Sequence, residues 1–514
     1  MAHLVGVSTL LQSRATDRTG RRFLRIDEIH GPVAGSSSLV RARVHSVRAA
    51  GNLVFVTLRQ AGCTLQAVMS KSDAVPKAAL KFVAGVTLES IVDVCGALVA
   101  PEKAIEGATC TAAELQIATF FVVSAAAPLP FQLADAMTPE PELAAYEAKC
   151  KAAAAALEAA VARGAAADEI AALEKAKEVV EGECRPVARA TSLDHRALDL
   201  RTPANLAIFR VQAAVCRLFR EHLTKHRFVE IQSPKLIGCL SEGGANVFEV
   251  TYFGKKAYLA QSPQFYKQMC ITADFERVFE VAPVYRAENS NTPRHMTEFI
   301  GLDLEMAFNE HYHEVVDMID SVFQHIFEGL FREHKHDLQI VAQQYPVEPL
   351  KFKFPSPLLT FADAVAMLRA DGVAQDPYED LSTENEKRLG KLVRDKFDTD
   401  YYRLDKFPES ARPFYTMPDP DDPKLTNSYD FFMRGQEVLS GSQRVHDMKL
   451  LLERARAKNV DIATIEGYTS SFKYGAPPHA GCGLGLNRVT FLFLGLTHIT
   501  QSTLFPRLTN RLYP

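Results

Sequence analysis

The segment from Phe275 to Met306, FERVFEVAPVYRAENSNTPRHMTEFIGLDLEM, gathers arginines, carboxylates and aromatic residues in one predicted hairpin. Its return strand alternates, because Leu302 and Leu304 fall on one face while Asp303 and Glu305 fall on the other. Buried carboxylates are costly unless they meet cations or amino groups. The hairpin therefore predicts one face that packs in a core and one face that binds a ligand, and the cations and aromatic residues of this segment are suited to a nucleotide.

Cations and acids elsewhere in the chain could complete such a site. Lys267 stands in YLAQSPQFYKQM and Arg444 in LSGSQRVHD. An inward-facing lysine is expensive unless an anion meets it, so two such cations together predict a ligand with an acidic group. Taken singly, each could equally be a solvated surface charge. Asp430, Glu437 and Ser440 offer the hard oxygen atoms that Mg²⁺ requires, although their spacing alone is weak evidence.

Length and composition limit the class of protein. At 514 residues the chain predicts roughly two or three domains. Nine cysteines are scattered singly without a CxxC pair, which favours a reducing compartment over a disulfide framework or a zinc site. We expect a cytoplasmic protein with no membrane segment, because no apolar run approaches the roughly 18 residues of a membrane helix. Arginines near the start leave organelle targeting open, and the net charge of -4 argues against non-specific coating of nucleic acid.

Four segments differ in character along the chain. Residues 1–37 form an extension of mixed polarity whose role is open. Residues 38–131 contain short β-rich runs separated by turn residues, which predicts an OB-fold barrel of about five strands. Residues 132–195 are expected to form a helical hairpin linker, because residues 139–184 are rich in Ala, Glu and Lys with Gly164 between two helical halves; it could be a spacer or an arm that contacts RNA. Residues 196–514 mix amphipathic helices with strands, as in an α+β domain.

At the hairpin the chain resembles motif 2 of the class II aminoacyl-tRNA synthetases. FVEIQSPKL is similar to motif 1 and GCGLGLNRVTFLFLG to motif 3, and all three occur in the family's order after the barrel. The resemblance implies an α+β fold, in which an OB-fold anticodon-binding domain precedes a catalytic domain built on an antiparallel β-sheet flanked by helices. It also implies a homodimer, whose protomers meet at Pro234.

The same resemblance implies an ATP site with Mg²⁺. The two catalytic residues are Arg286, on the α-phosphate, and Arg488, on the γ-phosphate. Phe299 stacks on adenine and Glu288 lies near its edge. The full set implied for ATP is Arg286, Glu288, His295, Phe299, Glu437 and Arg488, and the set implied for the metal is Asp430, Glu437 and Ser440.

Within the class, the segments around Lys267 and Arg444 resemble the aspartyl-tRNA synthetases of the eukaryotic cytosolic or archaeal type. The resemblance implies that aspartyl-adenylate is made from ATP and L-aspartate and that the aspartyl group is then transferred to tRNA(Asp). Asp303 meets the α-amino group, while Lys267 and Arg444 grip the side chain. The residues implied for aspartate are Glu242, Gln264, Lys267, Asp303, Ser440 and Arg444.

Three alternatives stay open at this point. An asparaginyl or lysyl relative would share the ATP site, but paired cations disfavour both amino acids. An inactive RNA-binding relative is suggested by Asn487, which stands where the family usually has an acid, and Cys482 also replaces a common glycine. An amide-forming asparagine synthetase on the same catalytic fold would lack the barrel. Charging of tRNA(Asn) and association with other synthetases are undecided.

In the barrel, three residues match positions by which related enzymes read the anticodon: Phe55, Gln66 and Glu114. In VFVTLRQ, Val54 and Val56 share one face of the predicted strand, while Phe55 lies on the other. An exposed aromatic ring can stack on an unpaired base. We therefore expect an anticodon-binding surface here.

Overall fold

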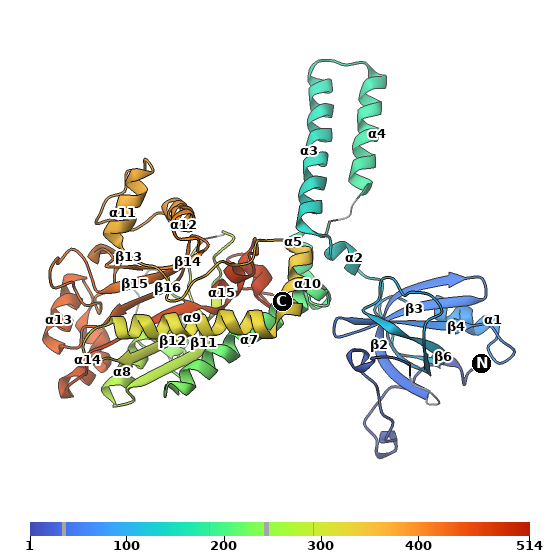
Figure 1. Ribbon diagram of the computed structural model, residues 1–514, viewed down its shortest axis with the longest axis horizontal. Coiled ribbons are helices and arrows are strands. Elements are labelled where there is room, and N and C mark those ends of the chain that lie inside the picture. The colour runs from blue at the N-terminus through green and yellow to red at the C-terminus, as the bar shows by residue number, and fades with distance from the viewer. Residues whose placement is uncertain (33–36, 184–185, 241–245, 291, 514) are drawn as a thin grey trace. The chain divides into compact units, whose positions relative to one another are not determined.

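The structure is a computed structural model that describes residues 1–32, 37–183, 186–240, 246–290 and 292–513. It divides into two compact units (Figure 1). The first unit comprises Met1–Met137, Arg185–Ala188 and Ala197–Leu206, and the second comprises Thr138–Cys184, Arg189–Arg196 and Ala207–Pro514. None of the helices in the described ranges combines the length and the apolar character needed to cross a bilayer.

The first unit is a closed β-barrel, as the sequence predicts. Its strands follow the order β1-β6-β4-β3-β2-β5, and β5 pairs again with β6 to close the barrel. Val54 and Val56 point into its core, as their alternation requires. The elements are β1 (Val5–Val7), β2 (Ser37–Ala50), β3 (Leu53–Gln60), β4 (Cys63–Ser70), α1 (Lys77–Ala84), β5 (Ile91–Val99) and β6 (Cys110–Ser124).

Part of the segment before the barrel contributes to it. β1 pairs in parallel with β6, and Ile26 and Ile29 lie buried in the barrel core. These residues show no strand pattern of their own, and their partners stand far along the chain: Val5 pairs with Phe120, and the Ile29 carbonyl oxygen accepts from Cys110.

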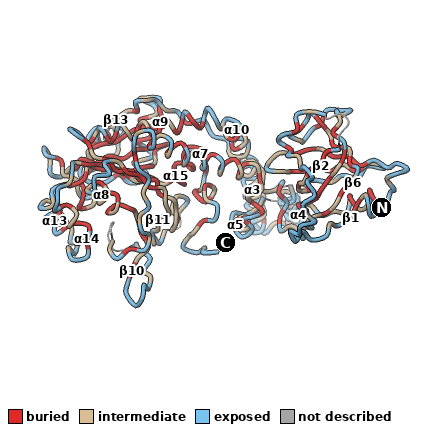
Figure 2. Tube along the Cα trace, turned by 90° about the horizontal axis from the view of Figure 1, so that it is seen from below, coloured by how far each residue is buried: buried red, intermediate tan, exposed pale blue. Residues whose placement is uncertain are grey.

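A helical hairpin follows the barrel in sequence (Figure 1). Gly164, with a φ of 69°, forms the turn between its two arms. Its residues are mostly exposed or half-buried, in contrast to the buried stretches of α7 (Pro203–Lys225), α9 (His313–Glu333) and α15 (Leu486–Phe493) (Figure 2). The helices of this region are α2 (Leu133–Ala136), α3 (Glu140–Ala162), α4 (Ala167–Glu183), α5 (Arg189–Asp194) and α6 (Arg196–Asp199).

The second unit is built on an eight-stranded sheet of order β13-β14-β15-β16-β17-β12-β11-β7. The six central strands are antiparallel, while β13 and β7 pair in parallel at the two edges. The strands are β7 (Val229–Glu230), β11 (Arg277–Tyr285), β12 (Glu298–Ala307), β13 (Leu358–Thr360), β14 (Tyr401–Asp405), β15 (Ser428–Met433), β16 (Gln436–Gln443) and β17 (His479–Gly485). A separate small sheet contains β8 (Leu236–Ile237), β10 (Lys255–Leu259) and β9 (Glu249–Tyr252).

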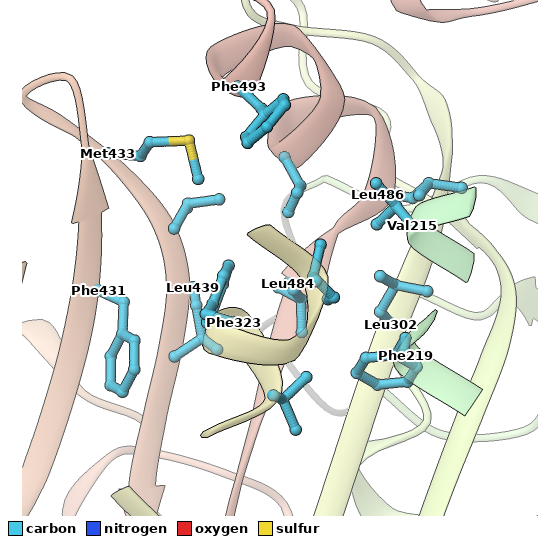
Figure 3. Close-up of a cluster of buried hydrophobic side chains, with 14 of the residues drawn as sticks. Val215, Phe219, Leu302, Phe323, Phe431, Met433, Leu439, Leu484, Leu486 and Phe493 are labelled. Atoms are coloured by element: carbon cyan, nitrogen blue, oxygen red, sulfur yellow. The ribbon is translucent and has the colours of Figure 1, made fainter. Parts of the chain in front are cut away.

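Helices α7 and α9 supply the core on one face of this sheet. Leu302 and Leu484 point toward them and pack with Phe219 and Phe323 (Figure 3). The helices of this part of the chain are α7 (Pro203–Lys225), α8 (Gln264–Thr272), α9 (His313–Glu333), α10 (Lys335–Gln344), α11 (Phe361–Ala370), α12 (Thr383–Phe397), α13 (Met448–Ala457), α14 (Glu466–Thr469) and α15 (Leu486–Phe493).

The glycines of β17 leave room on the opposite face. β12 and β17 are paired so that Gly481 stands opposite Glu305 and Gly483 opposite Asp303. A Cβ atom at Gly481 would lie 2.2 Å from Glu305 Oε2, and one at Gly483 would lie 3.1 Å from Asp303 Oδ1. The GCGLG sequence thus alternates between glycines that face the two acids and larger residues that face the core.

Candidate active site

A cavity of about 410 Å³ opens on the face of the sheet that carries the two acids. It brings together side chains from the hairpin, from α8, from β16 and from the β17–α15 junction. The predicted residues that line it are Gln264, Arg286, Glu288, His295, Phe299, Asp303, Glu437, Ser440, Arg444 and Arg488. Glu242 lies outside the described residues.

The open end of the β11–β12 hairpin presents a cation beside an aromatic ring. The Arg286 guanidinium lies 5.5 Å from the centre of the Phe299 ring, and its Nη1 is 3.9 Å from Glu288 Oε1. Glu288 also faces His295, with 3.8 Å between Oε2 and Nε2. Burial lowers the pKa of His295, although Glu288 opposes the effect. This geometry offers a flat ring with a charged group beside it, which suits a base attached to a phosphate.

The start of α15 brings a second arginine to the cavity. Arg488 Nη1 donates to the backbone oxygen of Glu437 across 3.3 Å. The neighbouring Asn487 is buried, and both ends of its amide make hydrogen bonds. Its Oδ1 accepts from the Ile300 backbone N–H, and its Nδ2 donates to Ser502 O at 2.8 Å and to Thr503 Oγ1 at 3.0 Å. An amide suits this place because it both accepts and donates.

Four buried charges lie at the floor of the cavity, where Asp303 and Arg444 line it and Lys267 and Glu305 stand behind them. Lys267 Nζ donates to Asp303 Oδ1 at 3.1 Å and to Cys482 O at 2.9 Å, and it lies 3.4 Å from Glu305 Oε2. Arg444 donates to both oxygens of Glu305, at 2.9 and 3.2 Å. Two cations and two carboxylates therefore compensate one another in a region from which water is excluded.

The structure places Lys267 one layer behind the cavity wall. Its side chain is 2% exposed and does not line the cavity, whereas Asp303 and Arg444 do. Lys267 thus orients Asp303 from behind. Direct contact with a bound carboxylate would require it to exchange one of its present partners.

The pKa values of Asp303 and Glu305 are shifted in opposite directions. Burial raises the pKa of Asp303, and Lys267 opposes that effect. Burial acts on Glu305 in the same sense, but Arg444 and Lys267 together hold the pKa of Glu305 below its ordinary value. Glu305 therefore keeps its negative charge to lower pH than an ordinary glutamate, while Asp303 takes up a proton more readily than an ordinary aspartate.

Two of the predicted metal ligands, Glu437 and Ser440, line the adjoining end of the cavity, and Asp430 is buried beside Ser440. Asp430 and Ser440 stand opposite each other on β15 and β16, and burial raises the pKa of Asp430, with Glu437 adding to it and Arg412 opposing. Among the described residues, no hydrogen-bond donor meets the buried Oδ1 of Asp430. The carboxylates of Asp430 and Glu437 and the hydroxyl of Ser440 are the hard oxygen donors that suit Mg²⁺, and Oδ1 of Asp430 is the buried one without a hydrogen-bond donor. The described residues contain no cluster of three or more His, Cys, Asp or Glu side chains able to hold a metal, and the predicted set is of a different composition.

Arg412 lines the cavity beside the predicted metal ligands, and the sequence analysis did not single it out. It follows η3 (Glu409–Ala411), is buried, and lies 2.8 Å from Asp430 Oδ2 through its Nη2. Its Nη1 donates to Ser440 Oγ at 2.7 Å. No periodic pattern surrounds the arginine in ARPFY. Its place in the site is therefore visible only from its contacts with Asp430 and Ser440 in the folded chain.

Gln264, which the resemblance implies for aspartate binding, is the first residue of α8 and lies buried at the cavity wall. Its Nε2 donates to Gln268 Oε1 at 2.9 Å, and Gln268 also contacts His479 Nε2 at 3.0 Å and accepts from Tyr468 at 3.1 Å. This network fixes the side chains of α8 below the cavity.

Pro234 is exposed and lies between β7, at the edge of the large sheet, and β8. Its neighbours are anchored to β11, because Ser233 donates to Glu280 through both its N–H, at 2.6 Å, and its hydroxyl, at 2.7 Å, and Lys235 Nζ lies 3.1 Å from the same carboxylate. The anchoring presents Pro234 outward in a fixed place.

In the barrel, the three predicted anticodon residues share an outer surface. Phe55 is half-buried, and the Arg48 guanidinium lies 4.7 Å from its ring centre. Gln66 Nε2 donates to Glu114 Oε2 at 2.5 Å, and Gln116 donates to the other oxygen at 2.7 Å. The surface offers a ring face together with amide and carboxylate groups, as base recognition requires.

Comparison with known protein families adds an independent result. Residues 188–509 match the family described as tRNA synthetases class II (D, K and N). Residues 39–118 match the OB-fold nucleic acid binding domain. The first match covers the large sheet and the cavity, and the second covers most of the barrel.

Individual proteins agree with this result. A curated relative from Bos taurus, named aspartate–tRNA ligase, cytoplasmic, is 48% identical over 513 residues, which is 99% of this chain and 94% of that protein. The solved structure of an aspartyl tRNA synthetase from Entamoeba histolytica has a TM-score of 0.86 at 43% identity and covers 99% of this chain and 96% of its own. An asparaginyl-tRNA synthetase from Pyrococcus horikoshii is less similar, with a TM-score of 0.75 at 27% identity over 93% of this chain and 96% of its own.

Proposed function

The chain belongs to the class II tRNA synthetases (D, K and N), and we propose that the cavity described above is where it activates its amino acid. Its function is that of an aspartate–tRNA ligase, with ATP, L-aspartate and tRNA(Asp) as substrates. The observation that supports the location is the convergence of Asp303, Arg444, Arg286 and Arg488 on one cavity.

The floor of the cavity selects aspartate. Asp303 accepts from the α-amino group of the substrate, and Arg444 meets the side-chain carboxylate. Lys267 supports both interactions from behind Asp303. An asparagine side chain would gain no charge interaction from these cations, and a lysine side chain would be repelled by them.

The wall formed by the hairpin and α15 binds ATP. The adenine ring stacks on Phe299 with Glu288 and His295 near its edge, Arg286 holds the α-phosphate and Arg488 holds the γ-phosphate. Asp430, Glu437 and Ser440 would hold Mg²⁺, which supplies positive charge to the phosphate oxygens when bound. Glu242, which lies outside the described residues, is assigned to aspartate binding on the resemblance alone.

The chemistry needs positioning and charge stabilisation rather than a protein nucleophile. An oxygen of the substrate's α-carboxylate attacks the α-phosphorus, and the bond from that phosphorus to the bridging oxygen of pyrophosphate breaks. Arg286 stabilises the charge that develops on the α-phosphate. A hydroxyl at the 3′ end of the tRNA then attacks the aspartyl carbonyl, and AMP leaves.

Recognition of the tRNA begins in the barrel. Phe55 stacks on an unpaired anticodon base, while Gln66 and Glu114 bind base edges. We place the protein in the cytoplasm, in line with the names of its relatives.

The protein acts as a homodimer whose protomers meet around Pro234. Its exposed position beside the edge strand β7 supports this, together with the exposed side chains of Val229 and Leu236 nearby. Sedimentation velocity tests it: a particle of twice the chain's 56.8 kDa is expected, and a monomer at micromolar concentration would contradict it.

The activity is tested by pyrophosphate exchange with aspartate, asparagine and lysine in parallel. Exchange should depend on aspartate and should be abolished in Arg286→Ala. Stronger exchange with asparagine than with aspartate would overturn the assignment, and charging of purified tRNA(Asp) and tRNA(Asn) determines the tRNA range.

A further inference from the structure

Helix α12 is a rigid element beside the ATP wall that belongs to none of the three motifs. It packs against β16, which carries Glu437 and Ser440. Gly390 on α12 approaches Gly435 so closely that a Cβ atom at Gly390 would lie 2.3 Å from the Gly435 Cα. Leu389 joins a small core of its own with residues of β14 and β15. The helix is therefore fixed relative to the cavity.

The first turn of α12 contacts a cation of the β11–β12 loop. Arg294 Nη2 donates to Thr383 Oγ1, and Arg294 Nη1 lies 3.8 Å from Glu386 Oε2. Arg294 also lines the cavity, between the hairpin and β16. Its guanidinium thus connects the loop, the cavity and α12.

Glu386 is largely buried near other carboxylates, so a neighbouring cation stabilises its charged form. Its side chain is 15% exposed, and burial raises the pKa of Glu386 to about 7, with Glu437, Asp430 and Asp380 adding to the effect and Arg294 opposing it. Grouped carboxylates disfavour ionisation of one another. The positive charge of Arg294 compensates the negative charge of Glu386. The same contact holds the Arg294 guanidinium in place.

We propose that Glu386, together with Thr383, is a positioning residue that holds Arg294 over the place of the ATP phosphates. The proposal rests on the ATP site of the proposed function. A free arginine loses several side-chain rotations when it binds a phosphate, and a preordered one has already lost them. Loss of Glu386 should therefore weaken ATP binding and leave the aspartate floor intact.

The test is Glu386→Gln, which keeps the shape and removes the charge. Glu384→Gln is the matched control, because Glu384 is an exposed acid in the same helical turn. Pyrophosphate exchange should show an about tenfold higher KM for ATP in Glu386→Gln, the ratio expected for loss of a charge-assisted contact, and an unchanged KM for aspartate. Equilibrium titration with ATP, without aspartate, should show the same loss of affinity. Glu384→Gln should match the wild type in both assays.

A double-mutant cycle shows whether Glu386 acts through Arg294. If it does, Glu386→Gln combined with Arg294→Met should be no worse than Arg294→Met alone. Losses that multiply would overturn the proposal, as would a wild-type KM for ATP in Glu386→Gln or equal rises for ATP and aspartate. A wild-type protein without aspartate-dependent exchange would instead refute the proposed function itself.

Discussion

Arg444 holds Glu305 through two hydrogen bonds, of 2.9 Å to Oε1 and 3.2 Å to Oε2, and both side chains are buried. The paired contacts fix the plane of the guanidinium. A third hydrogen bond, from Arg444 Nη1 to Ser442 Oγ at 2.6 Å, completes the fixation. Arg444 therefore faces the cavity in one orientation, before any ligand arrives.

Replacing Glu305 with Gln should destabilise the fold. The change leaves Arg444 and Lys267 without their shared anion, and losing one partner of a buried pair costs about 3 kcal/mol. Urea unfolding measures the difference, with Glu310→Gln as a control because Glu310 is exposed.

The pKa of Glu305 is lowered in the folded chain, so the contribution of Glu305 to the free energy of unfolding is complete above its ordinary value of 4.5 and is lost as the pH falls toward the lowered value. The difference between Glu305→Gln and the wild type should accordingly shrink in acid, and a constant difference would contradict this assignment.

Replacing Lys267 with Met should make aspartate binding more sensitive to pH. The pKa of Asp303 is already raised by burial, and Lys267 opposes that shift. Without the lysine, Asp303 should take up a proton at a higher pH and lose its attraction for the substrate's amino group. The KM for aspartate, followed from pH 8 downward by pyrophosphate exchange, should rise earlier in Lys267→Met than in the wild type, while the KM for ATP stays constant. Parallel profiles for aspartate would refute a role for Lys267 in charging Asp303.

Replacing Gly481 with Ala should disrupt the floor through size alone. The new Cβ atom would lie 2.2 Å from Glu305 Oε2 and 2.2 Å from the Leu304 carbonyl oxygen, and the second of these is backbone that cannot move aside. Overpacking of this kind costs about 1–3 kcal/mol or more. Thermal melting provides the measurement. Gly467→Ala is the control, since the new Cβ atom at that position would have nothing within 4 Å. This variant should melt at or above the wild-type temperature.

Much of this floor could be predicted from local pattern. The alternation of β12 correctly separated Leu302 and Leu304 from Asp303 and Glu305, because successive side chains of a strand point to opposite faces. The alternation of Val54 and Val56 predicted the barrel core in the same way. Such patterns depend only on neighbours in the sequence.

Contacts between distant segments could not be predicted in this way. Arg412 and Glu386 each stand alone in sequences without a distinctive pattern, and their ion pairs are made with partners brought near by the fold. The sequence also left open the depth of Lys267, which the structure places behind Asp303. How deeply Lys267 is buried depends on the packing of α8 against β12 and β17, which cannot be inferred from the sequence of any one of these segments.

Replacing Gln66 with Ala should separate the two halves of the reaction. Gln66 lies on the barrel and hydrogen-bonds to Glu114, so aspartate-dependent pyrophosphate exchange should be unchanged. Charging of tRNA(Asp) should lose roughly tenfold in kcat/KM, as expected when a base loses one hydrogen-bonding partner. Equal charging by the variant and the wild type would remove Gln66 from the anticodon surface.

Replacing Asn487 with Asp should be harmful here, although the family usually has an acid at this position. Nδ2 of Asn487 donates to the Ser502 carbonyl oxygen at 2.8 Å, and a carboxylate oxygen in its place would repel that carbonyl. Leaving a buried acceptor without its donor costs about 1–3 kcal/mol. The strain falls on the first turn of α15, so the adjacent Arg488 should lose its alignment and the KM for ATP should rise together with the loss of stability.

The control for this change is Asn459→Asp, because Asn459 is exposed. Thermal melting and pyrophosphate exchange on both variants test the argument. If Asn487→Asp melted like the wild type and kept its KM for ATP, the hydrogen bonds of Asn487 would not be what orients Arg488. If it melted lower and bound ATP more weakly while Asn459→Asp did neither, the hydrogen bond from Asn487 to Ser502 would be established as what secures the start of α15.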